Sequence, residues 1–112
     1  MRIGVVSDTH NNLKNVRRIV ELFNAAEVDR VIHTGDITQA KTIEAMGPLH
    51  APMIGVFGNN DQERPSLAAA IERFGFEFYE PPLQLCWDDR NIIVVHDPLE
   101  FEGHLNTQAI AL

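Results

Sequence analysis

Three stretches of the sequence have the same pattern, and this pattern indicates the fold. They read RIGVVSDTH at residues 2–10, VDRVIHTGD at residues 28–36 and PMIGVFGNND at residues 52–61. Each begins with a run of apolar, largely β-branched residues, which predicts a strand. Each ends in polar, turn-forming residues, which predict a loop. The order of strand and then loop therefore occurs three times.

Apolar residues recur at helical spacing after the first loop, with charged residues on the opposite face, and glycine or proline at their ends indicates helices after the other two loops. The predicted helices cover Leu13–Asn24, Thr38–Met46 and Ser66–Phe74. Strand, loop and helix repeated in this way indicate βαβ crossovers, which build parallel sheets. We therefore expect an α/β fold with a mainly parallel sheet and flanking helices.

After the third helix the pattern changes. Phe76–Tyr79 is predicted as a short edge strand, and Leu83–Trp87 and Ile92–Val95 flank a turn at residues 88–91, which predicts a β-hairpin. The spacing in His104–Leu112 predicts the opening turns of another helix, with no glycine, proline or basic residue to end it. This apolar end indicates either a chain that was cut short or one that docks against a partner.

Length and composition indicate a folded domain. The chain has 112 residues, which predicts a single domain over residues 1–112. Hydrophobic residues make up 45% and charged residues 22%, which excludes a disordered or fibrous chain. No apolar run approaches the about 18 residues of a membrane span, and no signal-peptide pattern follows Met1. We expect a cytoplasmic protein without a membrane partner.

The charge balance limits the partners of the protein. A net charge of −7 makes nucleic acid unfavourable as a stable partner, because binding phosphates without a metal requires clustered Lys and Arg. An acidic protein can still bind phosphates when divalent cations occupy its carboxylates. Cys86 is the only cysteine, which excludes a disulfide or a thiolate metal cage within one chain, and we expect it to be a buried strand residue.

Polar side chains gather where the predicted strands end. They are Asp8 and His10 after the first strand, Asp36 after the second, residues 58–61 after the third and His96 after the hairpin. Ligands of open α/β sheets bind outside the carboxyl ends of the strands. A mixed set of oxygen and nitrogen donors suits Mn²⁺, Fe²⁺ or Zn²⁺. A single Asp after a strand is more often a helix cap or a turn residue, so the prediction of a metal site depends on the joint pattern.

As a set, these motifs resemble those of the calcineurin-like metallophosphoesterase superfamily, and their short spacings resemble its small bacterial and archaeal phosphodiesterase branch. The resemblance implies two divalent metal ions, with Mn²⁺ favoured over Fe²⁺, Ni²⁺ or Zn²⁺. It implies that Asp8, His10 and Asp36 bind one ion, and that Asp36, Asn59 and His96 bind the other. Asp36 would bridge the two ions.

The resemblance also implies catalytic roles for Asn60, which would orient the phosphate, and for Asp61, which would hold the loop. Asn60 stands where larger family members carry a His and the small branch often a Cys. An amide cannot deliver a proton at neutral pH, so we expect good leaving groups to be favoured. Family members also continue to a Gly-His-x-His motif, and Gly103–Asn106 matches only half of it. The resemblance therefore implies a C-terminally incomplete fold, in which each metal lacks one protein ligand.

The resemblance predicts a metal-dependent phosphoesterase, acting on phosphodiesters through a water activated by two metals. One alternative is a catalytically impaired scaffold that acts through protein contacts. A receiver-like or nucleotide-binding domain fits the topology alone, but no Gly-x-Gly-x-x-Gly follows the first strand and Lys41 is the last lysine. An open sheet edge would allow a homo-oligomer. We expect His33 to pack or hydrogen-bond locally and His50 to be exposed.

Overall fold

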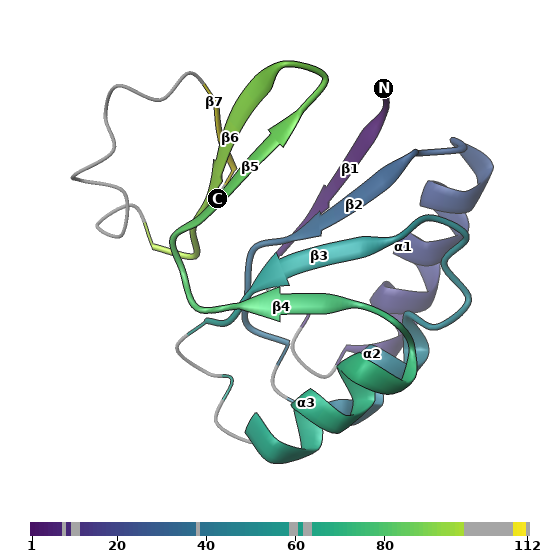
Figure 1. The fold of residues 1–112 in the computed structure, drawn as a ribbon. Helices are drawn as coiled ribbons and strands as arrows, with labels where there is room; N and C mark the ends of the chain where they lie inside the picture. The colour runs from purple at the N-terminus through teal and green to yellow at the C-terminus, as the bar shows by residue number, and fades with distance from the viewer. Residues whose placement is uncertain are drawn as a thin grey trace.

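A four-stranded parallel sheet forms the centre of the molecule (Figure 1). The computed structural model describes residues 1–7, 9, 12–37, 39–58, 61, 64–97 and 109–111. The strands of this sheet are β1 (Ile3–Val6), β2 (Arg30–His33), β3 (Met53–Val56) and β4 (Glu77–Tyr79). Neighbours in the sheet are neighbours in the chain, and every pair is parallel. The predicted α/β fold is confirmed.

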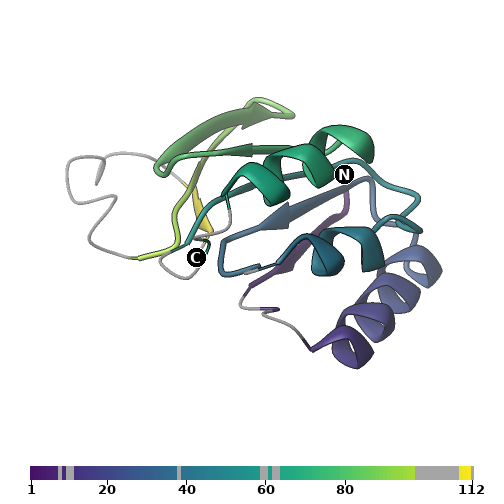
Figure 2. The ribbon, with the colours of Figure 1, turned by 90° about the horizontal axis from the view of Figure 1, so that it is seen from below.

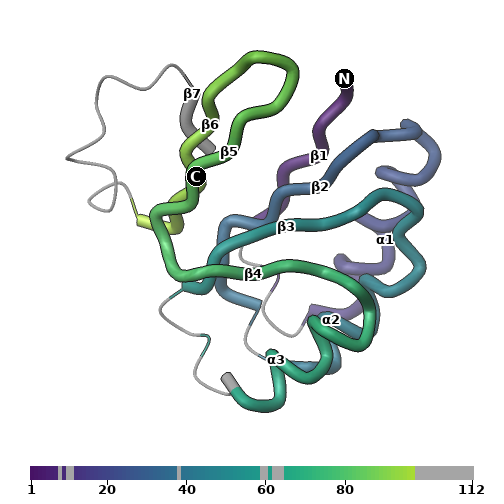
Figure 3. Tube along the Cα trace, viewed as in Figure 1, coloured from purple at the N-terminus to yellow at the C-terminus, as the bar shows by residue number. Residues whose placement is uncertain are grey.

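Three helices connect the strands of the parallel sheet. They are α1 (Leu13–Ala25), α2 (Ala40–Ala45) and α3 (Arg64–Arg73). Each connection moves to the next strand in the same direction, so right-handed crossovers place all of these helices on one face of the sheet. The Cα trace shows that the four strands run in the same direction and that α1, α2 and α3 lead the chain back on one face of the sheet (Figure 3).

The capping and apolar pattern of α1 explains why this helix forms where the sequence predicted it. The Asn12 side chain accepts a hydrogen bond from the Asn15 backbone N–H at 3.2 Å, which satisfies one of the unpaired donors at the helix start. Val16 and Val20 lie one turn apart and are buried against the sheet. The helix therefore packs through one apolar stripe.

Alternate residues of the central strands face two different cores. Val31 and Met53 pack with the helices, whereas Ile32 and Val56 pack on the opposite face. The opposite core is completed by apolar side chains of a second sheet, which lies on the side away from the helices (Figure 2). Because both faces are covered, the residues in the middle of β2 and β3 are apolar on both faces.

The second sheet consists of β5 (Leu83–Trp87), β6 (Arg90–Val94) and β7 (Ala109–Ala111). The predicted hairpin is confirmed, but its turn is shorter than predicted. Only Asp88 and Asp89 form the turn, with φ of 51° and 62°, the left-handed conformation that two-residue hairpins require. Pairing therefore extends to the ends of both strands.

Two sequence-based expectations in this region are wrong. Ala109–Ala111 is a strand that pairs in parallel with β6, where the start of a helix was predicted. So short an apolar run has no diagnostic period, and its pairing partner decides its conformation. The remaining residues of that predicted helix lie outside the described part. Cys86 lies in β5 as predicted but is exposed, because Leu85 and Trp87 take the side that faces the parallel sheet.

The amino ends of the parallel strands line a partly open pocket of about 290 Å³ between the two sheets. The Arg30 guanidinium lies over the Trp87 ring there, 5.0 Å from its centroid, and Glu77 and Leu85 also line the pocket. None of the described helices is long and apolar enough to cross a membrane.

Candidate functional site

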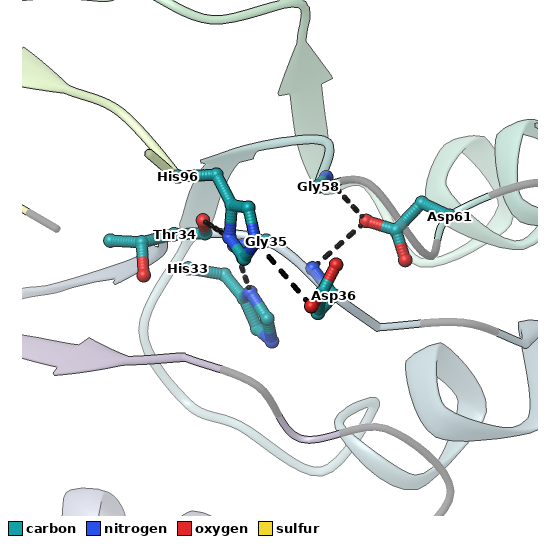
Figure 4. Close-up of polar contacts among 7 residues, drawn as sticks. All are labelled: His33, Thr34, Gly35, Asp36, Gly58, Asp61 and His96. Carbon is teal, nitrogen blue, oxygen red and sulfur yellow. Dashed lines mark hydrogen bonds and ion pairs between the residues drawn. The ribbon is translucent and has the colours of Figure 1, made fainter. Parts of the chain in front are cut away.

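The carboxyl ends of the strands bring together three of the predicted site residues. Asp36 follows β2, Asp61 follows β3 and His96 follows β6, and their side chains converge in Figure 4. The other predicted site residues lie outside the described part of the chain: Asp8, His10, Asn59 and Asn60. The structure therefore places the described residues at the predicted edge and leaves the complete ligand set as a prediction.

A tight turn aims the Asp36 carboxylate into this region. Gly35 and Asp36 both have positive φ, at 113° and 62°, a conformation that glycine adopts freely and aspartate tolerates. A Cβ on Gly35 would lie 2.8 Å from His96 Nδ1, and a Cβ on Gly58 would lie 2.6 Å from the Asp36 backbone N. Both glycines therefore lie where a Cβ would collide with the loops that carry the site.

Asp61 links the loop after β3 to the loop after β2. Its Oδ2 accepts hydrogen bonds from the Gly58 backbone N–H at 2.7 Å and from the Asp36 backbone N–H at 3.0 Å (Figure 4). The side chain is 1% exposed, so these charge-assisted bonds form in a low dielectric, where they are strong. The Asp61 carboxylate therefore fixes the backbone that carries the Asp36 side chain.

His96 presents one ring nitrogen to Asp36. Its Nδ1–H donates to the Thr34 carbonyl at 2.9 Å, and its Nε2 lies 3.4 Å from Asp36 Oδ2 (Figure 4). In the neutral imidazole the Nδ1–H bond leaves a lone pair on Nε2, directed at a carboxylate that also carries lone pairs. Metal-binding histidines are oriented in this way, by a carbonyl that holds the other nitrogen. With the imidazole protonated, the same two atoms form an ion pair.

These donors fit a divalent cation but do not complete its coordination. Among the described residues, no group of three His, Cys, Asp or Glu side chains lies close enough to hold a metal ion. Asp36 and His96 form a pair of oxygen and nitrogen donors, a chemistry that suits Mn²⁺, Fe²⁺ or Zn²⁺. A bound ion needs further ligands beyond this pair.

His33 is fully buried beside the site. Its Nδ1 accepts from the Gly35 backbone N–H at 3.0 Å, and its Nε2 lies 3.0 Å from Thr9 Oγ1. Burial lowers the pKa of the imidazole from 6.5 to about 3; the Asp36 charge opposes this shift and His96 adds to it. The expectation that His33 packs and hydrogen-bonds locally is confirmed, and His50 is exposed as expected.

Reasoning from the sequence did not consider Thr9 as a contributor to this region. Thr9 is buried, at 6% exposure, and its hydroxyl is hydrogen-bonded to the ring of His33, 24 positions later in the chain. The signal that could have identified this contact is the position of His33: a histidine at the end of an apolar strand needs polar partners, and the neighbouring loop supplies them.

Comparison with known proteins agrees with the fold and with the motifs. The model of the calcineurin-like phosphoesterase superfamily domain matches residues 1–111. A phosphodiesterase from Methanocaldococcus jannaschii is 45% identical over 97 residues, which cover 86% of this chain and 58% of the relative. The chain thus spans less than two thirds of the length of that relative.

Solved structures with the same fold include an archaeal phosphodiesterase with a TM-score of 0.77 and 34% identity, aligned over 83% of this chain and 57% of the other. A phosphoesterase from E. coli has a TM-score of 0.69 and 23% identity, over 88% of this chain and 59% of the other, and shows the fold alone. The resemblance inferred from the motifs is confirmed. This chain belongs to the calcineurin-like phosphoesterase superfamily.

Proposed function

We propose that this protein is a metal-dependent phosphoesterase that hydrolyses phosphodiesters. The observation that carries the proposal is the donor pair at the carboxyl end of the sheet, Asp36 Oδ2 and His96 Nε2, which lie 3.4 Å apart. Membership of the superfamily supports it. The names of the Methanocaldococcus jannaschii relative and of the archaeal structural neighbour, both phosphodiesterases, support the diester substrate.

The charge of the site requires a cation before a phosphate can bind. Asp36 and Asp61 are both buried carboxylates, at 5% and 1% exposure, in a chain of net charge −7. A phosphate ester brought to this edge would be repelled by both of them, and bound divalent cations would reverse that local charge. The electrostatics of the described residues therefore support metal dependence.

The proposed ligand set extends the described pair. We assign Asp8, His10 and Asp36 to one ion, and Asp36, Asn59 and His96 to a second, with Mn²⁺ as the favoured metal. Such ions, when bound, lower the pKa of a coordinated water and neutralise charge on a phosphate during in-line displacement.

The residues of the chain orient this chemistry. The Thr34 carbonyl keeps the proton on Nδ1 of His96, so that Nε2 keeps a lone pair that can bind a metal ion. Asp61 fixes the turn that carries Asp36. We propose that the Asn60 amide orients the phosphate; since an amide does not protonate a leaving group, esters with good leaving groups should react faster.

Hydrolysis of bis-p-nitrophenyl phosphate tests the proposal, with p-nitrophenyl phosphate as the monoester comparison. We expect Mn²⁺-dependent hydrolysis of the diester that a chelator abolishes, and slower hydrolysis of the monoester. Asp36→Asn should reduce the diester rate to background, because it removes the negative charge from the proposed bridging ligand.

Asp89→Asn is the matched control, because Asp89 has the same φ of 62° as Asp36 but lies in the exposed hairpin turn. This variant should keep the full rate. A diester rate that is unaffected by Asp36→Asn, or by the chelator, would contradict the proposal. A folded chain that binds no Mn²⁺ and hydrolyses neither ester would favour the alternative of a scaffold that acts through protein contacts.

Three expectations from the sequence stay predictions: a single domain over residues 1–112, a cytoplasmic location and a homo-oligomer. Analytical ultracentrifugation tests the last of these.

A further inference from the structure

A buried imidazole connects two loops at the carboxyl end of the sheet. His33 ends β2 with its ring on the helix-covered side, 5.8 Å from the Phe78 ring, and it is 0% exposed. The ring bonds through Nε2 to Thr9, in the segment after β1, and through Nδ1 to Gly35, in the turn after β2. A Cβ on Gly55 would lie 3.0 Å from His33 Cβ, so the glycine in the neighbouring strand leaves the room that His33 occupies.

The two hydrogen bonds fix the tautomer of the ring. The Gly35 backbone N–H can only donate, so Nδ1 carries the lone pair. The single proton of the neutral ring is then on Nε2, and Thr9 Oγ1 accepts it. The chain of donors therefore runs in one direction, from the Gly35 backbone through the ring to the Thr9 hydroxyl.

Both ends of this chain adjoin residues that we assign to the metals. In the sequence, Thr9 stands between Asp8 and His10, and Gly35 immediately precedes Asp36. We propose that His33 is a positioning residue of the metal centre, whose bonds to Thr9 and Gly35 hold the ligand loops after β1 and β2 in register. This inference rests on the proposed function, since it concerns the ligands assigned there.

A purely structural role explains the arrangement less well. An apolar residue would fill the same buried strand position without the desolvation of a ring that needs two partners. With a pKa of about 3, the ring stays neutral throughout the pH range in which divalent metals bind to histidine and carboxylate, so its tautomer and both bonds persist there. A fixed polar connection between two loops is the property that an apolar residue cannot supply.

Thr9→Val and Thr9→Ser test the connection with the least change of volume. Valine keeps the shape and removes the hydroxyl, whereas serine keeps the hydroxyl. The dissociation constant of Mn²⁺ is measured by electron paramagnetic resonance of the free ion, on protein shown to be folded by circular dichroism. We expect Thr9→Val to weaken Mn²⁺ binding by about tenfold or more, the range seen when an outer-shell partner is lost, and Thr9→Ser to restore it to within about threefold.

Thr42→Val is the matched control. Thr42 is buried like Thr9, but it lies in α2 and is not part of the connection. This variant should lower the unfolding temperature without changing the Mn²⁺ dissociation constant. Equal Mn²⁺ affinities of Thr9→Val and the unaltered chain would overturn the proposal, whatever the unfolding temperatures are.

Substitutions of His33 separate the two halves of the connection. Asn places its amide oxygen near the position of Nδ1 and can still accept from Gly35, whereas Gln places its amide nitrogen near Nε2 and can still reach Thr9. We expect each variant to weaken Mn²⁺ binding, and the imidazole ¹⁵N signals of the unaltered chain to show a proton on Nε2 alone. A proton on Nδ1 would contradict the assigned tautomer and overturn the proposal.

The outcomes distinguish this inference from the proposed function. If the unaltered chain binds no Mn²⁺, the proposed function fails and the positioning role fails with it. If the unaltered chain binds Mn²⁺ and Thr9→Val binds it equally well, only the positioning role fails.

Discussion

The two ends of the parallel sheet differ in the burial and the contacts of their polar side chains. The carboxyl ends carry three buried polar residues, Asp36, His33 and Asp61. The His33 ring accepts a hydrogen bond from the Gly35 backbone N–H, and the Asp61 carboxylate accepts one from the Asp36 backbone N–H. At the amino ends, Arg30 lies over Trp87 beside the pocket between the sheets, with its guanidinium on an aromatic face. Burying ionisable groups costs free energy that hydrogen bonds offset only in part. The carboxyl end therefore keeps an arrangement that stability alone would not favour.

The largest effect should come from closing the space around Asp36. In Gly58→Ala, the new Cβ would collide with the Asp36 carboxylate and lie 2.6 Å from its backbone N. We expect the free energy of unfolding in urea to fall by about 2–3 kcal/mol, as for other overpacked sites, and diester hydrolysis to fall to background.

Gly75→Ala is the comparison for that substitution. No heavy atom lies within 4 Å of a Cβ at Gly75, although its φ is 74°. The variant should lose about 1 kcal/mol from the left-handed backbone alone and keep its activity. Equal losses of activity in Gly58→Ala and Gly75→Ala would contradict the expectation that only the position beside Asp36 matters for hydrolysis.

Removing the charge of Asp61 should have a smaller effect on the unfolding free energy and on hydrolysis. Asp61→Asn retains an oxygen for the Gly58 and Asp36 backbone N–H groups but loses the charge that strengthens both bonds. We expect a loss of about 1–2 kcal/mol in unfolding free energy and a partial loss of hydrolysis. Both are measured on one preparation, by urea unfolding and by the diester assay.

Asp29 provides the counterpart at the amino end, because its Oδ2 accepts the Arg2 backbone N–H at 2.8 Å on the surface. Asp29→Asn should change the unfolding free energy by less than about 0.5 kcal/mol. A larger loss in Asp29→Asn than in Asp61→Asn would contradict the comparison.

The pH dependence of stability should report on His33. Its pKa is about 3 in the folded chain and 6.5 in the unfolded chain, so the unfolded chain binds more protons between these values. Stability from this group is complete above pH 6.5 and decreases as the pH falls toward 3. We expect the unfolding free energy to fall by about 1 kcal/mol between pH 7 and pH 5.5, and by less in His33→Gln.

Urea unfolding at each pH measures this difference, with His50→Gln as the control because His50 is an exposed histidine. If the unfolding free energy of His33→Gln changed with pH as much as that of the unaltered chain, the conclusion that His33 is buried in its neutral form would be wrong.

The smallest effect on activity should come from the amino end. Arg30→Ala removes the contact with Trp87 and should lower the unfolding free energy by about 0.5–1 kcal/mol. Hydrolysis of the diester should stay within about twofold, because Arg30 lies at the other end of β2 from the site. A tenfold loss would show that the amino end takes part in the reaction.

Much of the fold could be predicted because its signals are local. The strand-ending motifs and the helical spacing between them predicted the parallel sheet, and a two-residue turn at Asp88 and Asp89 required only a small correction to the hairpin. The exposure of Cys86 and the pairing of Ala109–Ala111 with β6 depend on which face of a strand meets another sheet. That information lies in tertiary contacts and not in the period of a short segment.

The site was predictable in its position but not in its supporting contacts. Parallel topology alone places Asp36 and Asp61 at one edge, since the carboxyl ends of parallel strands meet there. The bond between His33 and Thr9 joins residues 24 positions apart, and no sequence spacing predicts it. Asp8, His10 and Asn59 remain predicted ligands.

Anomalous diffraction at the manganese absorption edge, from a crystal of this protein grown with Mn²⁺, tests whether Asp36 and His96 bind the metal. We expect an anomalous peak about 2.2 Å from both Asp36 Oδ2 and His96 Nε2, a distance typical of metal ligands, with the Thr34 carbonyl still bonded to the other ring nitrogen. An occupied manganese position elsewhere, with Asp36 and His96 still in direct contact, would contradict it.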